Sequence, residues 1–137
     1  MAHKYILDTH ALVWFLEGNS RLGQKAIAVM ESDDSCIVLP LIALSEATLL
    51  IERGRIGIPS VSDLLSDVRE DERIEIFPLN WDVFERSLTT EGLSIPELHD
   101  RFIVSTGLHI QDLGDTVEII TRDESILESG VLPVIWD

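Results

Sequence analysis

Short apolar runs alternate along the chain with longer segments in which apolar residues recur every three or four positions. Short apolar runs are typical of strands buried in a parallel sheet, and the wider spacing is typical of helices with one buried face. Strands are predicted at residues 6–7, 36–39, 74–77, 117–121 and 134–136. Helices are predicted at residues 10–17, 22–30, 41–52, 61–68, 81–88, 97–108 and 124–129.

Residues with strong end preferences stand at the boundaries of these segments. Thr9, Ser60 and Asn80 each precede a predicted helix, and their side chains can accept hydrogen bonds from its free N–H groups. Gly18 and Gly130 follow predicted helices, where a left-handed residue commonly ends the helix. The boundaries therefore agree with the hydrophobic pattern.

Because strands and helices alternate throughout, right-handed crossovers should place helices on both faces of one sheet. We therefore expect an α/β fold of three layers, α/β/α, with a mainly parallel central sheet. The length of 137 residues suits one domain, taken as residues 1–137, and no internal repeat or linker divides it. With 45% hydrophobic residues the chain can bury a substantial core.

The charge balance narrows the function. Ten Lys and Arg residues face 25 Asp and Glu residues, for a formal net charge of -15. This balance argues against a protein that holds nucleic acid by a broad basic face. Any polyanion would need a local cationic patch or a bound metal, and most of the acids are expected to form a solvated surface that aids solubility.

The cysteine content and the longest apolar runs indicate the cellular compartment of the protein. The one cysteine, Cys36, excludes an internal disulfide and suits a reducing compartment. Its apolar neighbours predict a buried structural thiol. No apolar run approaches the ~20 residues that a membrane helix needs, and no signal peptide is evident. A cytoplasmic protein without a membrane segment is expected.

Four acidic residues occupy notable positions in this pattern. Asp8 and Asp123 follow the first and fourth strands. Glu46 stands in an otherwise apolar helix, and Asp100 stands in the first turn of another, where the helix dipole alone would favour a carboxylate. In a parallel sheet all four places can open on the edge where α/β proteins bind ligands.

Converging carboxylates would repel one another unless cations were present. Oxygen ligands without thiolates or paired histidines favour Mg²⁺ or Mn²⁺ over Zn²⁺. Two such ions can activate a water and stabilise the leaving oxygen of a phosphodiester, which is nuclease chemistry. The spacing alone is a weak signal, since any acidic α/β protein has acids near strand ends.

The order of several segments resembles the PIN domain family, in particular the small bacterial branch that includes the VapC toxins. The segments are residues 5–14, 44–47, 99–103 and 120–123, followed by an ending at residues 130–136 that is also similar. Each contains or adjoins one of the four acids, apart from the ending. The likeness covers essentially the whole chain, and the ordered set is far more specific than any one segment.

The resemblance implies a metal-dependent endoribonuclease that uses Mg²⁺ or Mn²⁺, with RNA as substrate. Within it, the four acids match the catalytic and metal-binding positions of the family. It further implies a toxin held by a cognate antitoxin, and a homodimer. The four catalytic and metal-binding positions are Asp8, Glu46, Asp100 and Asp123.

Neighbours of these acids are expected to be accessory residues. Thr9 matches a frequent hydroxyl neighbour of the first acid. Glu97 stands three residues before the third acid, where close relatives often carry Asp. Arg101 and Arg122 each adjoin a proposed ligand and can either grip phosphate or form surface ion pairs.

Other interpretations compete with the enzyme. The main alternative is a non-catalytic or weakly active PIN-like module that binds RNA or protein. Trp14, Trp81 and Trp136 could serve a dimer or antitoxin interface, or pack in the core. The pair of His99 and Asp100 is similar to HD-type phosphohydrolases, but those are helical proteins that need further histidines. Phosphorylated receiver domains and haloacid dehalogenases lack support from the neighbouring residues.

Overall fold

The computed structural model describes residues 2–137 and contains one sheet of five parallel strands. The strand order across the sheet is β3-β2-β1-β4-β5. The strands are β1 (His3–Leu7), β2 (Cys36–Pro40), β3 (Ile74–Phe77), β4 (Thr116–Ile120) and β5 (Val134–Ile135). The predicted three-layer α/β/α fold with a parallel sheet is confirmed.

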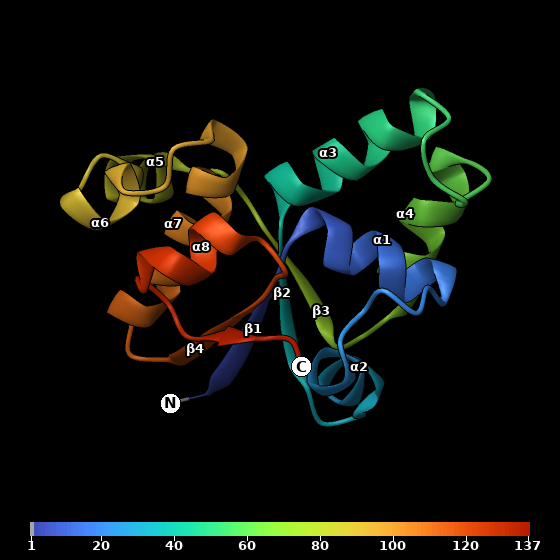
Figure 1. The fold of residues 1–137 in the computed structure, drawn as a ribbon, viewed down its shortest axis with the longest axis horizontal. Helices are drawn as coiled ribbons and strands as arrows, with labels where there is room; N and C mark the ends of the chain where they lie inside the picture. Colours follow the sequence, from blue (N-terminus) through green and yellow to red (C-terminus); the bar gives the residue numbers. More distant parts are fainter. Residues whose placement is uncertain (1) are drawn as a thin grey trace.

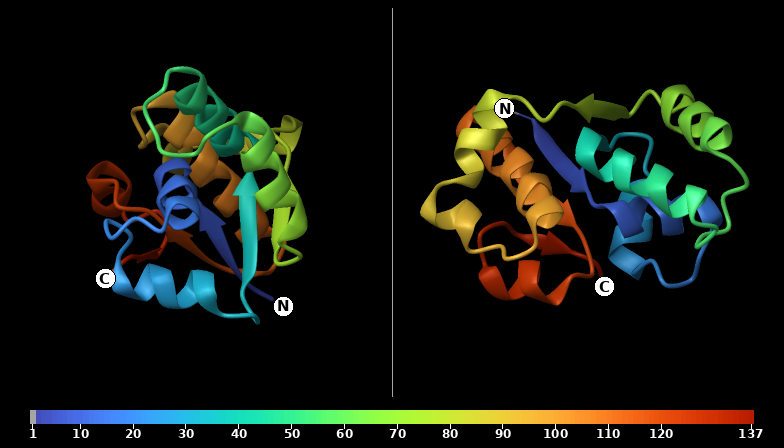
Figure 2. Two further views of the ribbon diagram at one scale, coloured as in Figure 1. Left: turned by 90° about the vertical axis from the view of Figure 1, so that its right-hand side faces the viewer. Right: turned by 90° about the horizontal axis from the view of Figure 1, so that it is seen from above.

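Eight helices connect the strands and form the outer layers within the described residues. They are α1 (Thr9–Glu17), α2 (Gln24–Glu31), α3 (Leu41–Glu52), α4 (Val61–Glu70), α5 (Trp81–Ser87), α6 (Thr90–Leu93), α7 (Leu98–Asp112) and α8 (Glu124–Ser129). Helices α1 to α4 lie on one side of the strands and α5 to α8 on the other (Figure 1). The view from above shows the same division (Figure 2).

The topology creates a crevice between β1 and β4. From β1 the chain moves outward through β2 to β3, and from β4 it moves in the opposite direction to β5. Right-handed crossovers that run in opposite directions place their helices on opposite faces. The two connections therefore diverge just beyond the carboxyl ends of β1 and β4, which is where α/β sheets bind ligands.

Strand β1 lies at the centre of the sheet and of the hydrophobic core. Ile6 and Leu7 are fully buried, as are Ile119 and Ile120 on the paired strand β4. Helix α7 approaches this pair closely at Gly107, where an added Cβ would stand 3.1 Å from the Ile6 side chain and 3.4 Å from that of Val117. The close approach fixes the position of α7, and with it the start of α7 at the sheet edge.

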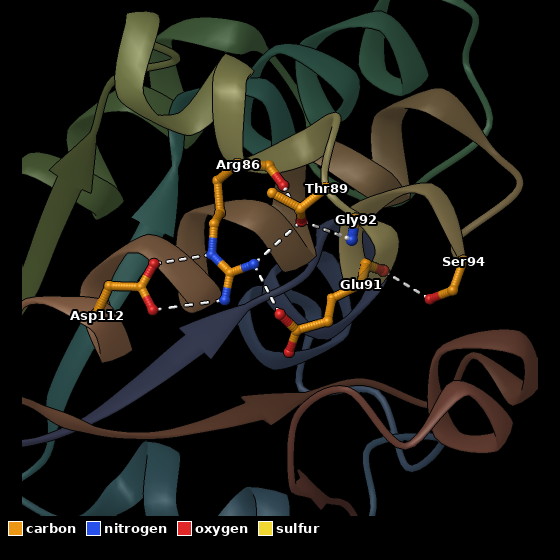
Figure 3. A network of polar contacts seen from close by, with 6 residues as sticks. All are labelled: Arg86, Thr89, Glu91, Gly92, Ser94 and Asp112. Atoms are coloured by element: carbon orange, nitrogen blue, oxygen red, sulfur yellow. Dashed lines mark hydrogen bonds and ion pairs between the residues drawn. The ribbon is translucent and has the colours of Figure 1, made fainter.

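A network around Arg86 joins the three helices of the β3–β4 crossover (Figure 3). Its guanidinium group donates to Asp112 at the end of α7, at 2.8 Å, and to Glu91 of α6, also at 2.8 Å. It further donates to Thr89, whose hydroxyl accepts from the Gly92 N–H group and so caps α6. One arginine thus holds α5, α6 and α7 together.

Several boundaries differ from the sequence-based predictions. Asp8 caps α1 and Thr9 is its first residue, because the Asp8 carboxylate accepts from the Ala11 N–H group. Helix α7 continues beyond residue 108 to Asp112, and β1 begins at His3. Ser60 and Asn80 cap α4 and α5 as predicted.

The prediction of a buried Cys36 thiol is wrong. Cys36 is the first residue of β2 and is exposed, although the rest of that strand is buried. The strand enters the sheet there, so its first side chain is not yet covered by a helix. None of the helices in residues 2–137 has the length and apolar character required to span a membrane.

Candidate metal and nucleic-acid site

A cavity of about 430 Å³ lies at the carboxyl ends of β1 and β4. Its wall brings together residues from α1, α3, α7 and the loop after β4, which are far apart in the sequence. It is lined by Asp8, Thr9, His10, Trp14, Glu46, Glu97, Asp100, Arg122 and Asp123. All four predicted acids therefore share one pocket, together with three of the four predicted accessory residues.

Asp8 and Asp123 are held by their helix caps. The Asp8 carboxylate accepts from the Ala11 N–H group at 2.9 Å and from the Thr121 hydroxyl. Asp123 caps α8 by accepting from the Ile126 N–H group at 3.0 Å, and it also accepts from the Ser125 hydroxyl at 2.7 Å. Both carboxylates are thus oriented before any ligand arrives.

Thr121 links these two acids. Its buried hydroxyl donates to Asp8 and accepts from the backbone N–H group of Asp123 at 3.0 Å. Leu7 pairs with Ile120 in the sheet, so the residues that follow each strand meet across the crevice. The strand register therefore determines the separation of the first and fourth acids.

Glu46 reaches the pocket from α3. One carboxylate oxygen accepts from the Thr9 hydroxyl at 2.8 Å, and the other lies 3.6 Å from the His99 ring nitrogen Nδ1. Thr9 is buried, and its hydroxyl, predicted to be an accessory group of the first acid, holds Glu46 in the structure. Glu46 is held between the first turn of α1 and the first turn of α7.

Asp100 enters the site from the first turn of α7. Glu97 caps that helix, because its carboxylate accepts from the Asp100 N–H group at 2.8 Å and lies 2.9 Å from His99. Among the described residues, none forms a hydrogen bond or ion pair with the Asp100 carboxylate. Asp100 is the one acid of the four that keeps both oxygens free of protein partners in residues 2–137.

The crowding of acids shows in the pKa values. Burial raises the pKa of Asp8 to about 6, although hydrogen bonds from Thr121 and Ala11 oppose the change. Burial, followed by the negative charges of Asp123, Glu97, Glu46 and Asp8, raises the pKa of Asp100 to about 7. The pocket therefore has a local excess of negative charge at neutral pH.

The donor set suits a hard divalent cation held partly through water. In residues 2–137 no group of three or more His, Cys, Asp or Glu side chains is arranged to hold a metal ion directly. Mg²⁺, however, keeps several of its waters and commonly uses only one or two carboxylates. The oxygen-only acids and their mutual repulsion fit such an ion, and Asp100 has free oxygens to offer.

One predicted accessory residue lies elsewhere. Arg101 is absent from the pocket wall, because its Nε atom donates to the Ile95 carbonyl oxygen at 2.9 Å and holds the loop before α7. No histidine was assigned to the site from the sequence, yet His10 lines the pocket and His99, at the start of α7, contacts Glu46. Their positions beside predicted acids were the available signal.

Trp14 and the hydroxyl residues were also not assigned to the site. Trp14 was considered for an interface or the core, and it forms part of the pocket wall. Thr121 and Ser125 each lie two residues from Asp123, a spacing typical of local hydrogen bonds: the Thr121 hydroxyl accepts from the Asp123 N–H group, and the Ser125 hydroxyl donates to the Asp123 carboxylate. That spacing could have identified both.

Three solved structures are similar to this chain over nearly its whole length. A toxin-antitoxin complex from Klebsiella pneumoniae is 18% identical, with a TM-score of 0.66 over 98% of this chain and 96% of that one. VapBC2 from Rickettsia felis, bound to a DNA fragment from its promoter, is 17% identical, with a TM-score of 0.69 over 98% and 99%. FitAcB from Neisseria gonorrhoeae is 15% identical, with a TM-score of 0.62 over 96% of both chains.

The sequence matches the PIN domain family over residues 5–128, a span that includes every acid of the pocket. No curated protein matches the sequence. PIN domains are generally nucleases that use divalent metal ions. The family match over nearly the whole chain and the shared fold agree with the pocket of carboxylates, and the chain belongs to the PIN domain family.

Proposed function

We propose that this protein is a metal-dependent endoribonuclease that hydrolyses RNA phosphodiester bonds with Mg²⁺ or Mn²⁺. The observation that carries the proposal is the convergence of Asp8, Glu46, Asp100 and Asp123 at the crevice between β1 and β4. Such a concentration of negative charge is unfavourable without a cation, and it lies where this fold class binds its ligands.

The four acids have different roles in the proposal. A bound divalent ion would lower the pKa of a water and stabilise the charge that develops on the phosphate oxygens. Asp8, Glu46 and Asp123 are held rigidly by hydrogen bonds and would fix the ion's position. Asp100 has free oxygens in the described structure and would accept hydrogen bonds from the attacking water.

Water is the nucleophile in this scheme, so no covalent enzyme intermediate forms. Attack on the phosphorus atom with departure of the 3′ oxygen leaves a 5′-phosphate and a 3′-hydroxyl. The products distinguish this mechanism from that of metal-independent ribonucleases, which leave a 2′,3′-cyclic phosphate. End-group analysis of cleaved RNA therefore tests the proposal independently of the rate.

The biological setting we propose is the toxin of a type II toxin–antitoxin pair in the cytoplasm, acting as a homodimer. The similar structure described as a toxin–antitoxin complex supports the partner, and the exposed apolar residues of α5 and its C-cap support a protein interface. Trp81 is 69% exposed and Leu88 is 54% exposed. Co-expression with any small protein encoded directly upstream, followed by co-purification, tests for an antitoxin.

The second candidate is a PIN-like module that binds RNA or protein with little or no catalysis. The net charge of -15 favours the protein-binding form of this candidate, because two divalent ions would still leave the chain strongly negative and repulsive to RNA beyond the ~8 Å screening length. In that case the acids would bind metal only for stability. The two candidates differ in a direct way, since only the enzyme loses a measurable activity when the acids are neutralised.

The deciding experiment is cleavage of a mixed-sequence RNA with Mg²⁺, with Mn²⁺ and with chelator. Asp8→Asn and Asp100→Asn should each reduce cleavage by at least about a hundredfold. Asp63→Asn is the matched control, because Asp63 occupies the same helix position in α4 that Asp100 occupies in α7. If both active-site variants cleave like the wild type, the enzyme is ruled out and the binding module remains.

A further inference from the structure

The pocket contains one strongly basic residue among its acids. The chain has ten Lys and Arg residues, and within residues 2–137 Arg122 is the one that lines the cavity. Five carboxylates share the same wall. Yet no Asp or Glu oxygen of the described residues lies within ion-pair distance of Arg122. Among the described residues Lys4, Arg73 and Arg86 have carboxylate partners at 2.8 to 3.6 Å, and the other seven Lys and Arg residues, Arg122 included, have none.

Trp14 contacts Arg122 in place of a carboxylate. The guanidinium carbon of Arg122 lies 5.9 Å from the centroid of the Trp14 ring, and that of Arg21 lies 5.8 Å from the same centroid. The two are the cation–π contacts of the described chain, and both use this ring. Trp14 is itself held by Trp136, at 5.9 Å between ring centroids.

A guanidinium group that rests on an aromatic face keeps its N–H groups at its edge. Those groups can then accept an oxyanion in the bidentate manner typical of Arg and phosphate. Arg122 and Arg21 are both exposed, and Arg21 has its backbone held by an N–H bond to the Asn19 side chain. Because both lie so close to one ring, the guanidinium carbons are less than about 12 Å apart.

We infer that Arg21, Trp14 and Arg122 form a phosphate track that guides a single RNA strand into the acidic pocket. The inference rests on the proposed function and adds the residues that hold the substrate. Arg122 binds a phosphate inside the pocket, beside the acids, and Arg21 binds another at its mouth. Trp14 is the positioning residue that aims both arginines.

The track answers the difficulty raised by the net charge. A protein of charge -15 repels RNA at long range, so it needs a short-range site in which cations are not neutralised by its own acids. The arginines on Trp14 meet this requirement. Phosphate contacts position a strand without reading its sequence, so their loss should weaken binding equally for RNAs of different sequence.

The test separates binding from cleavage. RNA binding is measured by fluorescence anisotropy with a labelled mixed-sequence RNA oligonucleotide in Mg²⁺, in the Asp100→Asn background that prevents cleavage. Arg21→Met and Arg122→Met are compared with Arg69→Met. Arg69 is an exposed arginine in the last turn of α4, and it does not line the pocket. Methionine keeps much of the side-chain volume and removes the charge.

Arg21→Met and Arg122→Met should each raise Kd by about three- to tenfold and reduce the slope of log Kd against log salt by about 0.7. In the cleaving protein the loss should fall mainly on KM. Arg122→Lys should recover only part of the affinity, because it restores the charge without the planar fork. Dissociation constants equal to those of Arg69→Met would overturn the inference.

The wild-type cleavage assay distinguishes this failure from that of the proposed function. Cleavage that persists while the arginines have no effect on binding removes the track and leaves the nuclease. Arginine-dependent binding without any metal-dependent cleavage removes the nuclease and leaves the track. Trp14→Phe tests the positioning role without emptying the core, and it should weaken binding by less than Arg122→Met, because Phe keeps a weaker cation–π face.

Discussion

Asp100 should make the protein less stable when no metal is present, and its replacement by Asn should therefore stabilise the fold. The carboxyl loses its proton near pH 3.8 in the unfolded chain but only at about pH 7 in the folded protein. Between these values the folded state binds more protons, so the free energy of unfolding falls as the pH rises. Above about pH 7 the penalty is complete and constant.

The magnitude follows from the two pKa values. A carboxyl with a pKa of about 7 instead of 3.8 costs ~4 kcal/mol at high pH if its charge is unscreened. Asp100 is only partly buried, and solvent screening reduces this figure by about half. We expect the free energy of unfolding of Asp100→Asn to exceed that of the wild type by about 2 kcal/mol at pH 8 in EDTA. The difference should vanish near pH 4.

Urea denaturation in EDTA at pH 4.5, 6 and 8 measures this difference in the free energy of unfolding. In thermal unfolding at pH 8, the Tm of Asp100→Asn should exceed that of the wild type by about 6 °C. Asp63→Asn has the same helix position outside the pocket, so its stability should show no comparable pH-dependent gain. Added Mg²⁺ should stabilise the wild type more than Asp100→Asn. A variant that is no more stable than the wild type at pH 8 would contradict the electrostatic account of the pocket.

Three further substitutions test the supports of the site. Thr121→Val removes the hydroxyl that joins Asp8 to the Asp123 N–H group, and it should cost about 1–2 kcal/mol of stability by urea denaturation and lower kcat for RNA about tenfold. Arg86→Met breaks the network that joins α5, α6 and α7, and thermal unfolding should show a loss of about 1–2 kcal/mol with little change in RNA affinity. Gly23→Ala places a Cβ in a steric clash with the backbone carbonyl group of Trp136, so it should cost about 2 kcal/mol or more, and equal stability would show that this close approach is easily relieved.

The local pattern of the sequence was sufficient to predict most elements, and the ordered set of segments that resembles the PIN domain family singled out the acids of the pocket. Short apolar runs and period-3.6 patterns depend on how much of a segment is buried, and that is set by consecutive residues. Asp8 and Asp123 could be placed because a parallel sheet brings the ends of its strands to one edge. The helix caps at Ser60 and Asn80 were predictable because each is a local hydrogen bond between residues three positions apart.

Only the tertiary structure decided which of the neighbouring side chains enter the pocket. Arg101 and Arg122 both adjoin a predicted acid, yet Arg101 binds the Ile95 carbonyl, while Arg122, in the loop after β4, rests on Trp14 of α1. The direction of a long side chain depends on partners from other helices, strands and loops. The hydrophobic periodicity of the sequence does not indicate these partners. The sequence by itself thus determined the fold and the acidic edge, whereas packing between elements decided where the cations lie.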